Sequence, residues 1–188
     1  NVDLTSLGPV KLVNAVAAEG TIEIEAFGEL QVGNLSAGGG GDIELTTTEA
    51  LKVIPGSAPI RAGDLQINAT SVPPLTTDVR SLGLDIRQAG DVVISNLGTA
   101  PLVLTDIVIP NGSLTATTAG SLVAERVVLG TNAEGKGVTL TSGGDLQIGV
   151  VNVGFYAATE AGADALRLSL LNATLRGAGV LRPADADL

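Results

Sequence analysis

The 188-residue sequence contains no cysteine, histidine, methionine or tryptophan. Without histidine and cysteine the chain cannot build a Ser-His-Asp triad, a thiol nucleophile, a zinc site of imidazole or thiolate ligands, or an iron–sulfur cluster. Aromatic residues make up only 2% of the chain, whereas 45% of it is hydrophobic and 25 residues are glycine. This apolar fraction excludes intrinsic disorder, and the core must be built from Val, Leu, Ile and Ala instead of rings.

Basic residues are also scarce, with ten Lys and Arg against twenty Asp and Glu and a formal net charge of −10. Such a chain cannot neutralise a row of phosphates, so we expect no nucleic-acid partner. No apolar run approaches the roughly 18 residues of a membrane span, and we expect none. Because the sequence starts at Asn1 and has no methionine, we expect a processed product or a fragment of a larger repetitive chain.

A short motif recurs along the chain: a glycine, then a small or acidic residue, then alternating apolar residues. The copies begin at Gly20, Gly41, Gly63, Gly90, Gly112, Gly137 and Ala165, the last three being weaker. Their leading apolar residues are 21 to 28 residues apart. Alternation with period two predicts a short strand with one buried face in each copy.

A second motif, Leu-x-apolar, opens another strand between these copies. It begins at Val10, Leu30, Leu51, Leu102, Leu122 and Leu146. Three copies carry a further apolar residue five places on, at Leu35, Ile107 and Val127. In the fourth repeat this motif is indistinct, with Val79 and Leu84 as candidates. An internal period of this length indicates a solenoid, because a propeller blade needs about 40 residues.

The sequence therefore predicts an all-β chain: a parallel β-helix, or β-solenoid, of about seven coils of 20–28 residues, forming a single domain over residues 1-188. Each coil is expected to contain two or three short strands. Glycine and asparagine, including Asn14 and Asn34, are expected at corners with positive φ. Two longer steps predict loops that leave the rod, at residues 70–78 and 155–164.

The paired motifs resemble the repeats of filamentous-haemagglutinin-like exoproteins and related giant bacterial surface proteins. The best copy is Gly-Gly-Asp-Leu-Gln-Ile-Gly-Val-Val-Asn at residues 143–152, and residues 28–34 and 119–122 are similar. The resemblance covers roughly residues 8–170. It implies a right-handed parallel β-helix that is secreted, displayed extracellularly at the bacterial cell surface, and used for adhesion and fibre building. It transfers no catalytic residue.

Two functional hypotheses follow. In the first, the chain is a non-catalytic structural and adhesive segment of a secreted or surface-displayed protein, flanked by further β-helix coils and facing host or cell-surface glycans or proteins. In the second, it is a self-assembling subunit whose ends stack into an extracellular filament or matrix.

A weaker alternative is a polysaccharide-active β-helix enzyme. Its candidate residues are Asp78, Asp85 and Asp106 with Arg80 and Arg87. Glycoside hydrolysis needs two carboxylates about 5–10 Å apart. Sugar sites usually add aromatic platforms, and this chain has almost none. We therefore expect no enzyme.

Asp42, Asp64 and Asp91 occupy the same place in three copies of the glycine motif. Stacked coils would bring these carboxylates about one strand spacing apart, and calcium is the natural ion for such oxygen ligands. The alternative is that each Asp accepts backbone N–H bonds at its turn and faces solvent. No other metal or cofactor is expected.

Threonines recur at residues 46–48, 115–117 and 139–141. Flat threonine arrays of this kind occur on β-solenoid ice-binding proteins. Such an array needs one face over many coils, and Glu23, Gln66 and Ser95 are expected to interrupt its columns. The sequence thus argues against ice binding, since exposed threonine is also common in ordinary strands.

Overall fold

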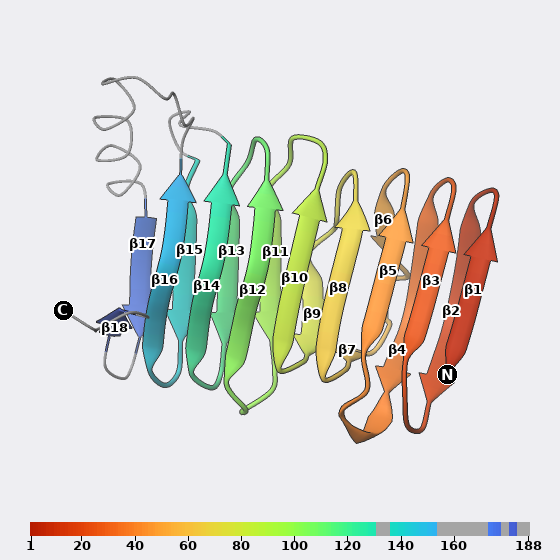
Figure 1. Cartoon of the computed structure of the whole chain (residues 1–188), viewed down its shortest axis with the longest axis horizontal. Helices are drawn as coiled ribbons and strands as arrows, with labels where there is room; N and C mark the ends of the chain where they lie inside the picture. Colours follow the sequence, from red (N-terminus) through yellow and green to blue (C-terminus); the bar gives the residue numbers. More distant parts are fainter. Residues whose placement is uncertain (131–135, 154–172, 178–180, 184–188) are drawn as a thin grey trace.

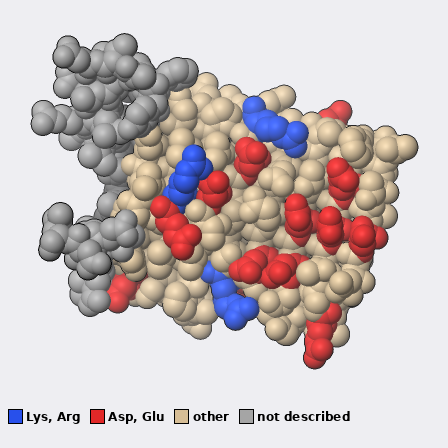
Figure 2. Space-filling model, viewed as in Figure 1, with Lys and Arg blue, Asp and Glu red and all other residues tan. Residues whose placement is uncertain are grey.

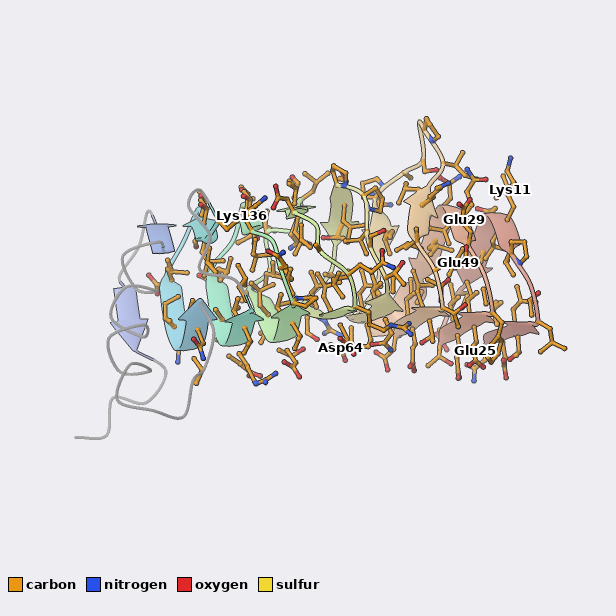
Figure 3. The ribbon with its side chains drawn as sticks, turned by 90° about the horizontal axis from the view of Figure 1, so that it is seen from above. Lys11, Glu25, Glu29, Glu49, Asp64 and Lys136 are labelled. Carbon is orange, nitrogen blue, oxygen red and sulfur yellow. The ribbon has the colours of Figure 1, made fainter. Side chains whose placement is uncertain are left out.

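The computed structural model describes residues 1–130, 136–153, 173–177 and 181–183. Eighteen short strands pair in parallel and form two sheets that face each other across a narrow core (Figure 1). Figure 3 shows the two sheets edge-on, with Glu25 and Asp64 on one side of the rod and Lys11 and Lys136 on the other. Over these ranges, no helix has the length and apolar character needed to cross a membrane.

We call the two sheets the front sheet and the back sheet, as they lie in Figure 1. The front sheet contains, in spatial order, β1 (Val2–Ser6), β3 (Ile22–Ala26), β5 (Ile43–Thr47), β8 (Asp64–Ala69), β10 (Ser81–Ile86), β12 (Leu102–Ile109), β14 (Leu122–Leu129), β16 (Leu146–Val153) and β18 (Leu181–Pro183). The back sheet contains β2 (Val10–Ala17), β4 (Leu30–Ala37), β6 (Leu51–Val53), β7 (Ile60–Arg61), β9 (Leu75–Asp78), β11 (Val92–Asn96), β13 (Leu114–Thr118), β15 (Val138–Ser142) and β17 (Ala173–Gly177).

The chain runs up the front sheet, crosses to the back sheet, runs down it and advances by one strand per turn (Figure 1). This path is a right-handed solenoid of about seven turns, the hand that connections between parallel strands almost always take. The predicted fold class is therefore confirmed.

The core is built by aliphatic side chains that stack on their equivalents in the next coil. Ile22 and Ile24 of β3 are register partners of Ile43 and Leu45 of β5, and all four are at most 1% exposed. Full burial of each such side chain contributes about 1.5–3 kcal/mol. The composition follows from this geometry, because two close parallel sheets leave room for branched aliphatic side chains and little room for rings.

The eight-residue strands bend in the middle. In β12 the inward residues Leu102 and Leu104 are followed by two outward residues, and Ile107 and Ile109 then point inward again. β14 repeats this pattern, with Val127 opening the second inward pair. The apolar residue predicted five places into the motif is thus confirmed as the start of a second short face of the coil.

The two motifs exchange sheets halfway along the solenoid. The glycine motif supplies β3, β5 and β8 of the front sheet, and then β11, β13 and β15 of the back sheet. The Leu-x-apolar motif makes the opposite change, from β2 and β4 to β12, β14 and β16. The exchange occurs at β9 and β10, where Leu82 is the register partner of Leu65, 17 residues earlier. An additional half-coil has been inserted there.

This half-coil explains why one predicted loop is wrong. Residues 75–78 do not leave the rod; they form β9, and only Val79 and Arg80 separate it from β10. The excursion lies one coil earlier, because β4 pairs with both β6 and β7 and residues 54–59 leave the sheet between them. The other predicted loop, residues 155–164, lies outside the described residues.

The excursion begins with a tight turn. The backbone N–H of Ser57 donates to the carbonyl of Ile54 over 3.2 Å, and Gly56 has a φ of 81°. Pro55 at the second position and Gly56 with positive φ at the third are the residues that a type II turn requires. The side-chain carbonyl of Asn34 accepts the N–H of Ala58 over 2.8 Å and anchors the excursion to β4.

The prediction of asparagine corners is wrong for Asn14 and Asn34. Both lie inside strands, β2 and β4, as register partners, and no described residue other than glycine has a positive φ. Several corners use a hydroxyl at the last residue of a short strand instead. The hydroxyls of Ser6, Thr47, Thr118 and Ser142 accept the backbone N–H groups of Gly8, Glu49, Gly120 and Gly144, respectively. A side-chain oxygen that bonds the N–H two residues on reverses the chain without positive φ.

Candidate functional site

The three aspartates predicted to share a column lie on two different sheets. Asp42 and Asp64 precede Ile43 and Leu65, which are register partners in the front sheet. Asp91 precedes Val92 of β11 in the back sheet. The exchange of the motifs is the physical reason for this separation. Within the described ranges no group of three or more His, Cys, Asp or Glu side chains is placed to hold a metal ion. Calcium binding at Asp42 and Asp64 stays a prediction.

Asp91 ties three successive coils together. Its carboxylate accepts the backbone N–H of Ser113 over 2.9 Å and the Lys136 ammonium over 2.8 and 3.0 Å. The Lys136 hydrogen bond, followed by those from Ser113, holds the pKa of Asp91 below its usual value of 3.8. The alternative interpretation, in which an aspartate accepts a backbone N–H, therefore holds for Asp91. The N–H comes from the next coil along.

An acidic ladder, Asp3, Glu23 and Glu44, crosses the outer face of the front sheet. The three residues are consecutive register partners on β1, β3 and β5, and all are exposed. Figure 2 shows acidic side chains gathered over this part of the front face. None of the three forms an ion pair with a described residue. Neighbouring carboxylates about 4.8 Å apart repel one another, so the ladder costs stability.

The sequence interpretation missed this ladder. Its signal is present, since Glu23 and Glu44 each follow the leading apolar residue of a glycine-motif copy by one position, and Asp3 follows Val2 in the same way. Only an alignment of these positions across successive coils places the three carboxylates in one column.

The residues considered for sugar chemistry are spread over both sheets, and four of the five bond to other coils. Asp78 lies in the back sheet and forms an ion pair with Arg61 over 3.5 Å. Asp85 and Asp106 lie in the front sheet, and Asp106 pairs with Arg126.

The two arginines of that set bond to backbone carbonyls about 40 residues earlier in the chain. The guanidinium of Arg80 donates to the Gly40 carbonyl over 3.4 Å, and that of Arg87 donates to the Thr47 carbonyl. Each of these hydrogen bonds joins residues 40 positions apart in the sequence and so connects coils on either side of the 17-residue coil between β8 and β10. Their chemical role is to fasten the solenoid where its regular spacing is interrupted.

The 54–59 excursion covers one side of a cavity of about 220 Å³ on the back sheet. Its walls include Ile54, Pro55, Ile60, Pro73 and Pro74. No charged side chain lines the cavity among the described residues. The cavity offers apolar and backbone contacts together with the two hydroxyl residues Ser57 and Thr76.

None of the described residues covers the outer side of the first coil. Over the described residues, β1 pairs only with β3 and β2 only with β4, so one backbone edge of each strand is free. The inward side chains of this coil, Val2, Leu4, Val10 and Leu12, are only partly buried against the core. Leu7 and Val13 on its outer surface are 89% and 63% exposed. Free strand edges beside apolar side chains favour pairing with a further strand.

The predicted threonine arrays are divided between the sheets. Thr46 lies on the front sheet, whereas Thr115 and Thr117 of β13 are register partners of Thr139 and Thr141 of β15 in the back sheet. Glu23 and Gln66 lie on β3 and β8 of the front sheet. The expectation that they interrupt the threonine columns is therefore wrong. Ser95 does lie in one of the columns, as the register partner of Thr117.

In comparisons with known proteins, no family model, curated protein or solved structure matched the chain.

Proposed function

We propose that the chain is a non-catalytic structural and adhesive segment of a secreted or surface-displayed bacterial protein of the filamentous-haemagglutinin-like kind. The observation that carries this proposal is the continuity of the solenoid. Coil follows coil in register, and the inward side chains are nearly all aliphatic. Stacked repeats that contact only their neighbours build long rods, which is what a stalk or a fibre needs.

The charged side chains support the same role. The ion pairs of the described residues, Glu29–Lys52, Arg61–Asp78, Asp106–Arg126 and Asp91–Lys136, all join different coils. Exposed pairs contribute little individually, at about 0–1 kcal/mol. Repeated along a rod, such pairs help to hold neighbouring coils in register.

Antibody labelling tests surface display. An antiserum raised against the purified chain is applied to intact cells of the source organism and to cells with permeabilised envelopes, followed by gold-labelled secondary antibody. We expect label on intact cells or in the medium. Label that appears only after permeabilisation would refute display and secretion. Adhesion is tested separately with chain-coated beads on host cells and on glycan arrays, with beads coated with an unrelated acidic protein as the control.

A second candidate function is self-assembly into an extracellular filament. The uncovered edges of β1 and β2 favour it, because a further solenoid end placed there would pair the free backbone groups and bury Val2, Leu4, Val10 and Leu12. End-to-end contacts between identical subunits give open fibres when the rotation between them does not close.

Two lysine variants on β1 separate this candidate from the first. Leu4 points toward the core at the open end, whereas Thr5, the next residue, is exposed. Leu4→Lys places a charge in the stacking surface and should abolish fibres in negative-stain micrographs, and Thr5→Lys should retain them. A wild-type chain that elutes as a monodisperse monomer at high concentration would eliminate the filament. The structural-segment proposal would not be affected by that result.

A further inference from the structure

We propose that the outer face of the back sheet, between β9 and β15, binds ice. We call this surface the threonine face. It consists of two columns of outward residues on neighbouring strands. The first column contains Val93, Thr115 and Thr139, and the second contains Thr76, Ser95, Thr117 and Thr141. Six of these seven residues carry a hydroxyl group.

The columns form a two-dimensional grid. Neighbouring strands repeat at about 4.8 Å, and outward residues two positions apart on one strand are separated by about 6.6 Å. The register is unbroken from β11 to β15, with five consecutive partners in each pairing. An ordered water lattice also repeats in two dimensions, so a rigid hydroxyl grid can hydrogen-bond to many of its water molecules at once.

The hydroxyl groups of the grid are free to bond water. Within the part of the chain that the structure describes, Thr115, Thr117, Thr139 and Thr141 form no side-chain hydrogen bond with another residue. Two threonines on the front sheet, Thr46 and Thr105, do form such bonds. The hydroxyl of Thr46 accepts a bond from Asn68, and that of Thr105 donates to the Leu82 carbonyl.

The grid is also rigid. Threonine is branched at Cβ and is therefore restricted in χ1. The residues that alternate with the grid, Ile94, Leu114, Ala116 and Leu140, are at most 1% exposed, so each strand is held from inside. A surface that is already ordered loses little conformational entropy when it binds a lattice.

Charges lie at the margins of the threonine face and are paired there. Asp91, one position before β11, bonds to Lys136. Asp78, at the end of β9, pairs with Arg61. The front sheet, in contrast, carries the acidic ladder on its outer face, and unpaired carboxylates orient water around themselves.

The same chemistry disfavours other occupants. Sugars usually stack on aromatic rings, and the two columns contain none. A protein partner would need an apolar patch, whereas the larger exposed apolar side chains at this face are Val93 and Leu97, at 40% and 55% exposure. The threonine face offers mainly hydroxyl groups, which form hydrogen bonds with water.

A bulky substitution in the middle of the grid tests the proposal. Purified full-length chain is equilibrated with a slowly growing ice hemisphere, and the fraction incorporated is measured together with thermal hysteresis. We expect wild type to concentrate in the ice. Thr117→Tyr should lose this enrichment, because the ring holds the lattice away from the surrounding hydroxyls. The matched control is Thr5→Tyr on the front sheet, which should behave like wild type. Circular dichroism verifies that both variants fold.

Two results would overturn the proposal. One is wild-type chain excluded from ice to the same extent as an unrelated soluble protein. The other is equal incorporation of wild type and Thr117→Tyr, which would move any ice affinity to another surface. Suspensions of insoluble cellulose and chitin form a parallel arm. Binding to them that Thr117→Tyr abolishes, without ice incorporation of wild type, would assign the face to a polysaccharide. The surface-display proposal does not depend on any of these outcomes.

Discussion

Replacement of Gly112 by alanine should destabilise the solenoid, whereas the same replacement at Gly90 should not. Both glycines begin copies of the same motif and lie in adjacent coils. A Cβ added at Gly112 would overlap the carbonyl oxygen of Gly90 and approach the Ile109 side chain to 3.3 Å. A Cβ added at Gly90 would meet nothing within 4 Å. A comparison of Gly112→Ala with Gly90→Ala therefore isolates the free-energy cost of the Cβ overlap between neighbouring coils.

The backbone has little freedom to relieve this overlap. The residues on both sides of Gly112 are fixed by backbone hydrogen bonds. The backbone carbonyl of Asn111 accepts the N–H of Gly90 over 2.8 Å, and that of Ser113 accepts the N–H of Val92 over 2.8 Å. Forcing a methyl group into such a contact costs about 1–3 kcal/mol. Weakening a bracketing hydrogen bond adds about 0.5–1.5 kcal/mol. The lower entropy of the unfolded alanine chain returns about 0.4–1 kcal/mol.

The net expectation for Gly112→Ala is a loss of about 1–3 kcal/mol, equivalent to a fall in Tm of roughly 3–10 °C for a chain of this size. Gly90→Ala should be neutral or stabilising by up to about 1 kcal/mol. Urea unfolding followed by far-ultraviolet circular dichroism measures both variants against wild type. Equal urea midpoints for the two variants would refute the reasoning, because the Cβ overlap at Gly112 would then have no effect on the free energy of unfolding.

Three further predictions concern side chains. Glu23→Gln, in the middle of the acidic ladder, should stabilise the chain by about 0.5–1 kcal/mol, a gain that shrinks with added salt; a loss of stability at low salt would contradict it. Asn96→Ala should cost about 2–4 kcal/mol in urea unfolding, because it strands the buried N–H and carbonyl of Val79, which Asn96 now bonds over 2.9 and 3.2 Å. The pKa of Asp91 is lowered in the folded chain, so its ionised form stabilises the fold above the unfolded pKa, and this contribution is lost as pH falls through the folded pKa. Lys136→Met should raise the Asp91 pKa toward 3.8, as followed by NMR titration of its carboxyl carbon, and an unmoved titration would exclude Lys136 as the main cause.

The buried polar residues show one limit of sequence reasoning. Thr47, Thr77 and Asn96 are at most 2% exposed. Alternation with period two places them on the inward face, but the sequence does not show which groups would satisfy their hydrogen bonds. The Asn96 side chain accepts bonds from the Thr77 hydroxyl and the Val79 N–H, and both partners belong to an earlier coil. A buried polar group needs such partners, and only the stacking of coils supplies them.

The candidate site shows a second limit. Asp42, Asp64 and Asp91 have equivalent places in the repeat, yet Asp91 lies on the other sheet. The sequence argues against a threonine array because Glu23, Gln66 and Ser95 share the place of the threonines in the repeat. Glu23 and Gln66 lie on the opposite face of the rod, whereas Ser95 does lie in one of the columns. Residues at equivalent places in the repeat share a sheet within each half of the chain. They lie on opposite sheets when one precedes the exchange at β9 and β10 and the other follows it.

The sequence by itself determined the parallel solenoid, its aliphatic core and the positions of most strands, because alternation and a recurring glycine are local properties of the chain. Only the tertiary structure decided which copies share a sheet. That assignment depends on the length of every preceding coil, and the single half-coil at β9 and β10 reverses it for all later copies. The threonine face follows from this reversal, which places the later glycine-motif copies on the back sheet, whereas the acidic ladder of the earlier copies lies on the front sheet.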